Sequence, residues 1–220
     1  MFENRKEAGK KLAIALAAYK NDKPIVLAIP RGGVEVGYYI ADFLQAPLSI
    51  IVVRKLPFPD NPESGFGAVA EDGTVFLIED VSRDVPPDTI KEIIKEQIAE
   101  VKRRIKVLRQ DTPLPELKDK TVILVDDGIA MGSTMRAAVT LCRNRGAKTI
   151  VVAAPVAGPA TAEEFAKIAD DVVILEKPAN FRAVAQIYRN WYDVSDEEVI
   201  EIMVKVVSRQ AVSPRKNNSL

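Results

Sequence analysis

The sequence lacks histidine altogether and has a single cysteine among its 220 residues. Without histidine, Ser-His-Asp and Cys-His catalysis are excluded, and so is the commonest ligand of transition metals. Cys142 has no partner for an intramolecular disulfide, and the N-terminal stretch MFENRKEAGKK lacks the apolar core of a signal peptide. A reducing, cytoplasmic setting is therefore expected, and acid–base chemistry must fall to carboxylates, lysine or tyrosine.

An excess of one charge is also missing, because Lys plus Arg and Asp plus Glu both total 31. The chain as a whole therefore offers no electrostatic attraction to a polyanion, and nucleic acid is not an expected partner. No apolar run approaches the roughly 20 residues that cross a bilayer, so no membrane association is expected. With 47% hydrophobic residues, the chain suits one medium-sized globular domain.

Short apolar runs of strand length alternate along the chain with helical patterns of apolar residues. The runs are 24–29, 48–53, 121–125, 149–154 and 172–175, and the helical patterns are 5–19, 34–44, 89–109, 134–145 and 161–169. This alternation predicts an α/β fold with a mainly parallel central sheet and helices on both faces. Ser195, followed three residues later by Glu198, predicts the start of a last helix, and the polar segment 208–220 is expected to be disordered.

Three segments interrupt this alternation. KLPFPDNPESGFG, residues 55–67, is rich in turn-forming residues and predicts a mobile functional loop or an Ω-like excursion. AVAEDGTVFLI then carries Asp-Gly between β-rich arms, which indicates a hairpin. The basic stretch KRRIK within 89–109 could suggest RNA binding, but Glu92, Glu96 and Glu100 share its helix and favour a solvated face.

The stretch VILVDDGIAMGSTMRAA, residues 122–138, sets two adjacent carboxylates at the end of a buried strand. Ligands of such sheets bind outside the carboxyl ends of the strands, where the N-terminus of the next helix attracts phosphate. Small and hydroxyl residues that leave room for an anion and can donate to it follow: Gly128, Ala130, Gly132, Ser133 and Thr134. Asp126 and Asp127 would repel that anion, so they are expected to bind sugar hydroxyls or a divalent cation, unless they only cap the helix.

The strand, acid pair, loop and helix from Val122 to Thr134 resemble the phosphoribosyl pyrophosphate (PRPP) motif of the type I phosphoribosyltransferases. The resemblance implies that Asp126 and Asp127 bind the ribose hydroxyls and, as the metal-site residues, Mg²⁺, the implied cofactor, with Asp127 also acting in catalysis. It implies that the following residues cradle the 5′-phosphate: Gly128, Ile129, Ala130, Met131, Gly132, Ser133 and Thr134.

Two further segments carry the same resemblance. IPRGG, residues 29–33, looks like the pyrophosphate-binding loop, which implies binding by Arg31, Gly32 and Gly33 and a cis peptide at Arg31–Gly32. VVRKLP, residues 52–57, is similar to the Val-Arg-Lys stretch of adenine and orotate members. Arg54 and Lys55 are accordingly expected to be catalytic residues that reach the pyrophosphate; simple solvent exposure is the alternative for such a basic pair.

The sequence departs from the family pattern at two positions of the loop. Met131 stands where many relatives have threonine, which implies weaker binding of the 5′-phosphate. Ala130 stands where 6-oxopurine enzymes place an aspartate, so hypoxanthine and guanine are less expected as acceptors. Phe181, with Tyr188, Trp191 and Tyr192 behind it, is the candidate to stack on the acceptor base; packing in the core is the alternative.

The resemblance extends from Arg5 to about Val204 and implies the type I phosphoribosyltransferase fold, with a hairpin or flexible loop and a small hood. Residues 1–207 are expected to form a single domain, with its hood built from the N-terminal segment and about 176–194. The implied activity is Mg²⁺-dependent transfer of ribose 5-phosphate from PRPP to a small-molecule base, with release of pyrophosphate and closure of residues 55–67 against water. The resemblance also admits a homodimer.

Two other functions are compatible with parts of this pattern. A regulator on the same fold would keep the PRPP pocket as a sensor and bind RNA, DNA or a protein partner. A Rossmann-type nucleotide binder ranks lower, because no G-x-G-x-x-G follows the first strand.

Overall fold

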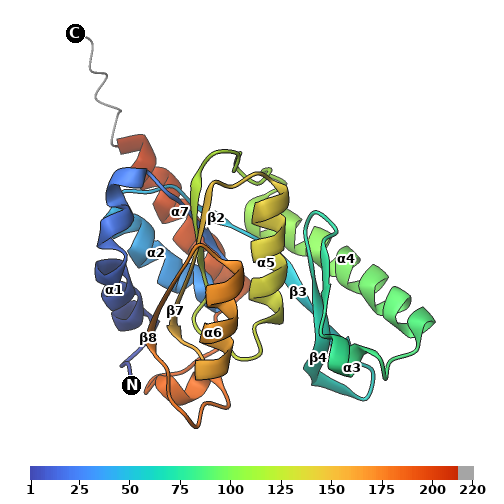
Figure 1. The fold of residues 1–220 in the computed structure, drawn as a ribbon. Helices are drawn as coiled ribbons and strands as arrows, with labels where there is room; N and C mark the ends of the chain where they lie inside the picture. Colours follow the sequence, from blue (N-terminus) through green and yellow to red (C-terminus); the bar gives the residue numbers. More distant parts are fainter. Residues whose placement is uncertain (213–220) are drawn as a thin grey trace.

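The computed structural model describes residues 1–212 and has a five-stranded parallel sheet at its centre (Figure 1). The strands lie in the order β2-β1-β6-β7-β8 and are β1 Ile25–Ala28, β2 Leu48–Ile50, β6 Thr121–Val125, β7 Thr149–Val156 and β8 Asp171–Glu176. Neighbouring strands pair in parallel throughout this sheet. The predicted α/β fold with a mainly parallel sheet is therefore confirmed, and the carboxyl ends of the strands point downward in Figure 1.

Helices cover both faces of the central sheet. On one face lie α5 Ser133–Asn144 and α6 Pro159–Ile168; on the other lie α1 Arg5–Ala15, α2 Gly32–Leu44 and α7 Asp196–Val212. Successive side chains of β6 enter opposite cores, because side chains alternate across a strand. Ile123 belongs to the core under α1 and α2, whereas Leu124 belongs to the core under α5. Burial on both faces explains why β6 is apolar at every position from 122 to 125.

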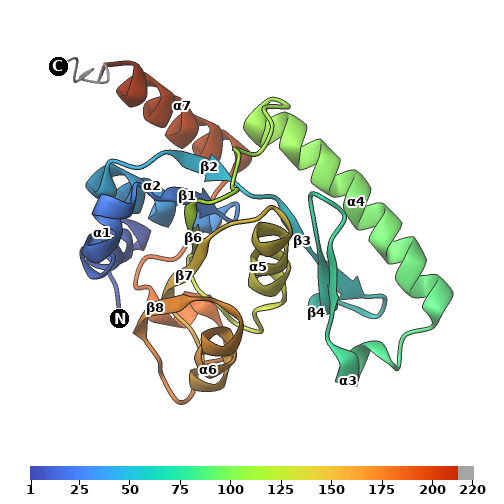
Figure 2. The same cartoon turned by 45° about the horizontal axis from the view of Figure 1, so that its top comes forward.

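A second, antiparallel sheet stands beside the first (Figure 2). Its strands are β3 Val53–Phe58, β4 Asn61–Ala70 and β5 Val75–Leu77; α3 Glu79–Ser82 follows, and the long helix α4 Pro87–Arg109 packs along β3. The predicted Asp-Gly hairpin is confirmed between β4 and β5, where Gly73 has a φ of 87°. One hydrophobic core contains both Val26 of β1 and Phe66 of β4, which supports the proposed single domain over 1–207.

The prediction of a loop over residues 55–67 is wrong, because this segment forms most of the β3–β4 hairpin. The register shifts between Leu56 and Pro57 and again between Pro57 and Phe58, which breaks the alternation by which a strand is recognised in a sequence. The predicted strand over 48–53 is also divided. It leaves the central sheet after Ile50 and enters the second sheet at Val53.

Two helix boundaries also differ from prediction. The helix expected over 5–19 ends at Ala15, and a 3₁₀ helix, Ala17–Asp22, replaces its last turn. The last helix continues through Val212, so the predicted tail is wrong over 208–212, and its remainder lies outside the described residues. The predicted cap is confirmed: the Glu198 N–H donates to Ser195 Oγ (3.1 Å) and the Ser195 N–H donates to Glu198 Oε2 (2.8 Å).

The N-terminal residues pair with the segment that follows β8, as expected for the hood. The Phe2 N–H donates to the Ile187 carbonyl (2.7 Å), and the Arg189 N–H donates to the Phe2 carbonyl (2.9 Å). A 3₁₀ helix, Val184–Ile187, lies within this segment, and its Val184 side chain packs where a Cβ at Gly128 would be. Across residues 1–212, none of the helices combines the length and apolar character that a bilayer crossing requires.

Candidate active site

The PRGG loop and the acid pair meet at the carboxyl edge of the central sheet. They follow β1 and β6, which are neighbours in register, with Ala28 opposite Val125. A Cβ at Gly32 would overlap the Asp127 carboxylate, and one at Gly33 would lie only 2.8 Å from the Val125 carbonyl oxygen. The two glycines therefore allow the end of β6 to pack directly against the loop.

The PRGG loop contains the expected cis peptide one bond earlier than predicted. The bond between Pro30 and Arg31 is cis, so the prediction of Arg31–Gly32 is wrong. The residues of the motif locate the loop, but they do not distinguish between two adjacent peptide bonds. Arg31 itself is partly exposed, and its Nη1 lies 3.7 Å from Asp196 Oδ1 at the start of α7.

Asp126 and Asp127 have different surroundings although they are adjacent. Asp127 Oδ2 accepts a hydrogen bond from Arg5 Nε at 2.7 Å, and the Arg5 side chain is only 3% exposed. Asp126 Oδ1 accepts from the Asp127 N–H at 2.9 Å. Burial, and after it the charge of Asp127, raises the pKa of Asp126 well above its ordinary value of 3.8. Asp127 is thus paired directly with the buried Arg5, whereas the charge of Arg5 only partly offsets the effects that raise the pKa of Asp126.

Aromatic residues of the hood surround the Arg5 guanidinium. Its central carbon lies 4.1 Å from the ring centre of Trp191 and 5.2 Å from that of Tyr192, and its Nη1 donates to the Tyr192 carbonyl at 2.9 Å. The Tyr188 hydroxyl donates to the Asp127 carbonyl at 2.7 Å. Aromatics expected behind Phe181 therefore hold Arg5 and, through it, Asp127.

The backbone of the loop between β6 and α5 is hydrogen-bonded to β7 and to α6. The Ile129 N–H donates to the Val156 carbonyl (2.8 Å), and the Thr161 hydroxyl donates to the Ala130 carbonyl (3.1 Å). Gly132 has a φ of 77° where α5 begins, a conformation that favours glycine. Within the described chain no side chain caps α5, so its first N–H groups are available to an anion; that they cradle a phosphate stays a prediction.

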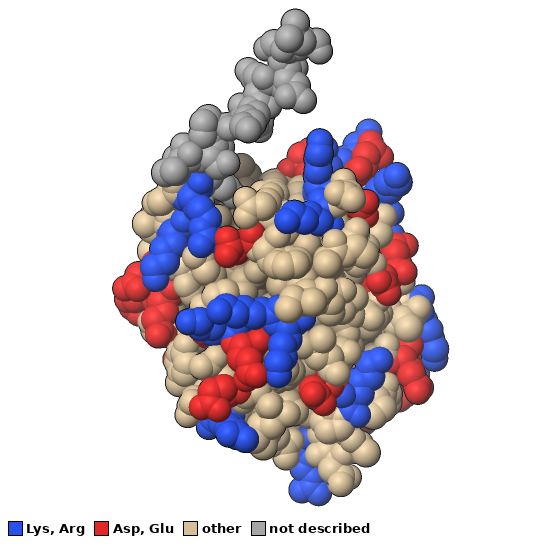
Figure 3. Space-filling view, turned by 90° about the vertical axis from the view of Figure 1, so that its left-hand side faces the viewer, with Lys and Arg blue, Asp and Glu red and all other residues tan. Residues whose placement is uncertain are grey.

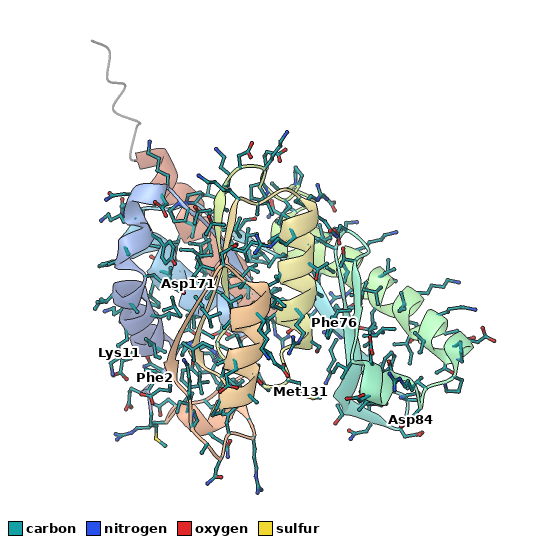
Figure 4. All side chains as sticks on the ribbon, in the orientation of Figure 1. Phe2, Lys11, Phe76, Asp84, Met131 and Asp171 are labelled. Carbon is teal, nitrogen blue, oxygen red and sulfur yellow. The ribbon has the colours of Figure 1, made fainter. Side chains whose placement is uncertain are left out.

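The predicted cradle residues differ in exposure. Ser133 is buried, Thr134 is half-buried, and Met131 is 57% exposed at the lower end of α5 (Figure 4).

A cavity of about 330 Å³ adjoins this loop. Its lining combines the loop, the start of α6 and the hood: Ala130, Met131, Gly158, Pro159, Ala160, Thr161, Ala179, Phe181 and Arg182. Phe181 is half-buried and lines this cavity rather than belonging to the two large cores. The structure therefore brings Phe181 together with Ala130 and Met131 around one cavity; stacking of Phe181 on an acceptor base stays a prediction.

The predicted basic pair is divided by the strand that carries it. Arg54 of β3 faces α4, where its Nε donates to Gln97 Oε1 at 3.2 Å. Lys55 lies on the opposite face, against Gly65 of β4, because successive side chains of a strand alternate. Burial lowers the pKa of Arg54, and the charge of Arg104 adds to this effect. The charge of Arg31 in the PRGG loop also acts on Arg54, whereas Lys55 lies on the other side of the hairpin.

Comparison with known proteins agrees with this geometry. The family model described as "Phosphoribosyl transferase domain" matches residues 3–189. The chain belongs to the phosphoribosyl transferase domain family. The two loops that meet at the sheet edge and most of the hood lie inside the matched phosphoribosyl transferase domain, which ends before Trp191 and Tyr192. The predicted family and fold class are therefore confirmed.

Individual relatives show how far this phosphoribosyl transferase domain extends. Two Mycobacterium tuberculosis proteins, from strains CDC 1551 and H37Rv and provisionally named phosphoribosyl transferases, are 40% identical over 205 residues, covering 92% of this chain and 46% of theirs. The chain thus spans about half the length of these curated relatives. The crystal structure of TT1426 from Thermus thermophilus is 36% identical with a TM-score of 0.78, covering 93% of this chain and 98% of that chain.

The acid pair of this phosphoribosyl transferase domain fits a metal only in combination with a ligand. Among residues 1–212, His, Cys, Asp and Glu side chains nowhere gather in groups of three or more that could hold a metal ion. Mg²⁺ commonly binds through one or two carboxylates together with substrate phosphates and water. Asp126 and Asp127 therefore fit a Mg²⁺ that is bound together with a diphosphate, rather than a resident site made of protein ligands alone.

Arg5 is the functional residue that sequence reasoning missed. It lies on the buried face of α1, three and seven residues before Ala8 and Leu12, which are fully buried. A charged residue at a core position of a helix needs a partner, and this is a signal that could have been noticed. The sequence could not identify that partner, because Asp127 is 122 residues away.

Proposed function

We propose that this phosphoribosyl transferase domain transfers ribose 5-phosphate from PRPP to a nitrogen atom of a small-molecule base and releases pyrophosphate. The observation that carries the proposal is the contact of Gly32 with the Asp127 carboxylate. This contact brings the PRGG loop, which suits a pyrophosphate, next to the acid pair, which suits a ribose diol. The uncapped start of α5 lies at the same edge of the sheet. PRPP carries a pyrophosphate, a ribose diol and a 5′-phosphate in the same order as these three segments.

In this proposal each segment has one task. The backbone of residues 128–134 binds the 5′-phosphate, Asp126 and Asp127 bind the ribose hydroxyls, and residues 31–33 bind the pyrophosphate. The bond from ribose C1 to the pyrophosphate oxygen breaks, the acceptor nitrogen bonds to C1, and the nitrogen loses its proton to solvent or pyrophosphate. Magnesium, held by Asp126 and Asp127 together with PRPP, would neutralise charge on the departing pyrophosphate.

The chain contributes mainly charge that is already in place before the reaction. Arg31 and Arg54 stabilise the negative leaving group, and Asp127 stabilises the positive charge that develops on the ribose. Lys55 has no part in this step, because it lies on the other face of the hairpin. Such preorganised groups are each worth about 3 kcal/mol of transition-state stabilisation. Arg5 holds the Asp127 carboxylate in one orientation, so the ribose acid is in place before substrate binds.

The cavity beside Ala130 and Phe181 is the proposed site of the acceptor base. Phe181 offers an aromatic face on which a planar heterocycle can stack. Ala130 supplies no carboxylate to a purine, which argues against the 6-oxopurines. The acceptor is therefore a planar nitrogen heterocycle other than hypoxanthine or guanine.

The direct test measures pyrophosphate release with PRPP and Mg²⁺ against a panel of purines, pyrimidines and other nitrogen acceptors. With the active acceptor, Asp127→Asn should abolish turnover while the circular dichroism spectrum stays unchanged. Asp84→Asn is the matched control, because Asp84 is an exposed acid beside α3, away from the sheet edge (Figure 4), and it should keep full activity. Full activity of Asp127→Asn would contradict the proposed role.

The same experiment separates the enzyme from a PRPP-sensing regulator. A regulator would bind PRPP without forming product from any acceptor, and RNA, DNA or a protein partner would change that affinity. The face seen in Figure 3 mixes Lys and Arg with Asp and Glu and presents no continuous basic surface for nucleic acid. The enzyme is therefore the preferred proposal.

A further inference from the structure

Helix α4 presents a row of polar side chains to the strand that carries Arg54. Gln97, Glu100 and Arg104 are spaced three and four residues apart, so they lie on one face of the helix. Gln97 accepts the hydrogen bond from Arg54, and Glu100 Oε1 accepts from Arg104 Nε at 2.9 Å. The Arg104 side chain, only 14% exposed, thus lies on this face about two helical turns from Gln97.

Arg103 adds a second cation at the same place. Its Nε and Nη2 donate to the two oxygens of Glu100 at 2.7 and 2.9 Å, and its side chain is 53% exposed. The charges of Arg103 and Arg104 both act on Arg54, and so does that of Arg31 in the PRGG loop. The KRRIK stretch is therefore more than the solvated face expected from the sequence, because two of its residues lie beside the proposed pyrophosphate side of the site.

The start of α7 closes this group of charges. Asp196 acts electrostatically on Arg103, and its Oδ1 lies 3.7 Å from Arg31 Nη1. That oxygen is buried and, within the described residues, accepts no hydrogen bond. Four guanidinium groups thus face three carboxylates, those of Glu100, Asp196 and Glu197, and carry a surplus of positive charge where the PRGG loop, β3, α4 and α7 meet.

We propose that Arg103 and Arg104 belong to the pyrophosphate-binding site, in which they exchange Glu100 for oxygens of a diphosphate group held also by Arg31 and Arg54; this inference rests on the proposed function. Guanidinium groups match phosphate oxygens with paired hydrogen bonds. A dianionic or more highly charged ligand also relieves the repulsion among these cations, which a single carboxylate on α4 only partly offsets.

The test measures binding of inorganic pyrophosphate with Mg²⁺ to the full chain by isothermal titration calorimetry. Arg103→Met and Arg104→Met should each weaken binding about tenfold, the loss of one charge-assisted contact. Lys102→Met is the matched control: it removes the same charge from an exposed position of α4 that is neither three nor four residues from Arg103 or Arg104, and it should change binding less than twofold. Arg103 is half in solvent, so its variant is expected to fold even where Arg104→Met does not.

The outcomes distinguish this inference from the function on which it rests. If wild type binds pyrophosphate and Arg103→Met, Arg104→Met and Lys102→Met bind it equally well, the arginines of α4 are not part of the site and the proposed function stands. An equal loss in Lys102→Met would also overturn the inference, because it would indicate only a general effect of charge. If wild type fails to bind pyrophosphate, the proposed function itself is contradicted.

Discussion

Arg5 Nε lies 2.7 Å from Asp127 Oδ2, so that a residue of the first helix holds an acid at the end of β6. The side chains are 3% and 13% exposed, which makes this a buried ion pair. Arg5→Met should therefore lower the free energy of unfolding by about 3–5 kcal/mol, because it leaves the Asp127 charge buried and unpaired. Urea denaturation followed by circular dichroism measures the loss.

Two further variants show whether the pair itself is responsible. Lys6→Met removes an exposed charge from the same helix and should change stability by less than about 0.5 kcal/mol. The double variant Arg5→Met with Asp127→Asn should recover part of the loss, because no unpaired charge remains. Purely additive effects would show that Arg5 contributes through packing and not through Asp127.

The difference in free energy of unfolding between Asp126→Asn and wild type should favour the variant more at pH 7 than at pH 4. The pKa of Asp126 is raised above 3.8 in the folded state, so the folded protein binds this proton more tightly than the unfolded chain does. Stability therefore falls as the pH rises above 3.8, a loss that asparagine avoids. Urea midpoints at the two pH values test this, with the exposed Asp60→Asn as control. A difference independent of pH would mean that Asp126 titrates normally.

A second buried ion pair joins the end of α4 to the residues that follow β4 in the second sheet. Arg109 Nη1, at the end of α4, donates to Glu71 Oε2 at 2.9 Å and to the Ile50 carbonyl at 2.8 Å. Glu71 Oε2 accepts from the Val52 N–H at 3.2 Å. The two side chains are 7% and 5% exposed, so Arg109→Met should cost about 3–5 kcal/mol in denaturant unfolding.

An exposed pair on the same helix gives the comparison for Arg109. Lys91 and Asp88 are 2.9 Å apart, but their side chains are 75% and 91% exposed. Lys91→Met should therefore cost less than about 1 kcal/mol. Equal losses in the two variants would show that burial does not decide the strength of these pairs here.

Cys142 should be unreactive until the protein unfolds. It is fully buried, and burial raises the pKa of its thiol from 9.0 to about 12, which cuts the thiolate fraction at pH 8 by about a thousandfold. Its reaction with a disulfide reagent such as dithionitrobenzoate should be correspondingly slow in the native protein and fast in concentrated guanidinium. Rapid reaction under native conditions would indicate frequent local opening of α5.

The elements that the sequence predicted best are those whose pattern is local. β6 is apolar throughout because both faces are buried, and the acids and small residues after it mark the strand end unambiguously. The β3–β4 hairpin was missed because its bulges at Pro57 break the alternation of side chains. The strand over 48–53 was predicted whole because its sequence does not show that it changes sheets after Ile50.

The candidate site was predictable where one motif supplies several residues. Asp126, Gly32 and Arg31 were each expected at the sheet edge from the segments that contain them. Arg5 was missed because its partner lies far away in the sequence. Arg103 and Arg104 look like any solvated basic stretch, and only the packing of α4 on β3 places them beside Arg54. Contacts between elements decide these roles, and a one-dimensional pattern does not contain them.

The pairing of Phe2 with residues 187–189 has a practical consequence for recombinant work. An affinity tag joined directly before Met1 would emerge beside the hood, where it could crowd the acceptor cavity and loosen the hold of α1 on the acid pair. The far end of α7 lies on the opposite side of the molecule from that hood (Figure 1). Purification handles and immobilisation chemistry are therefore better attached after the last helix than before the first.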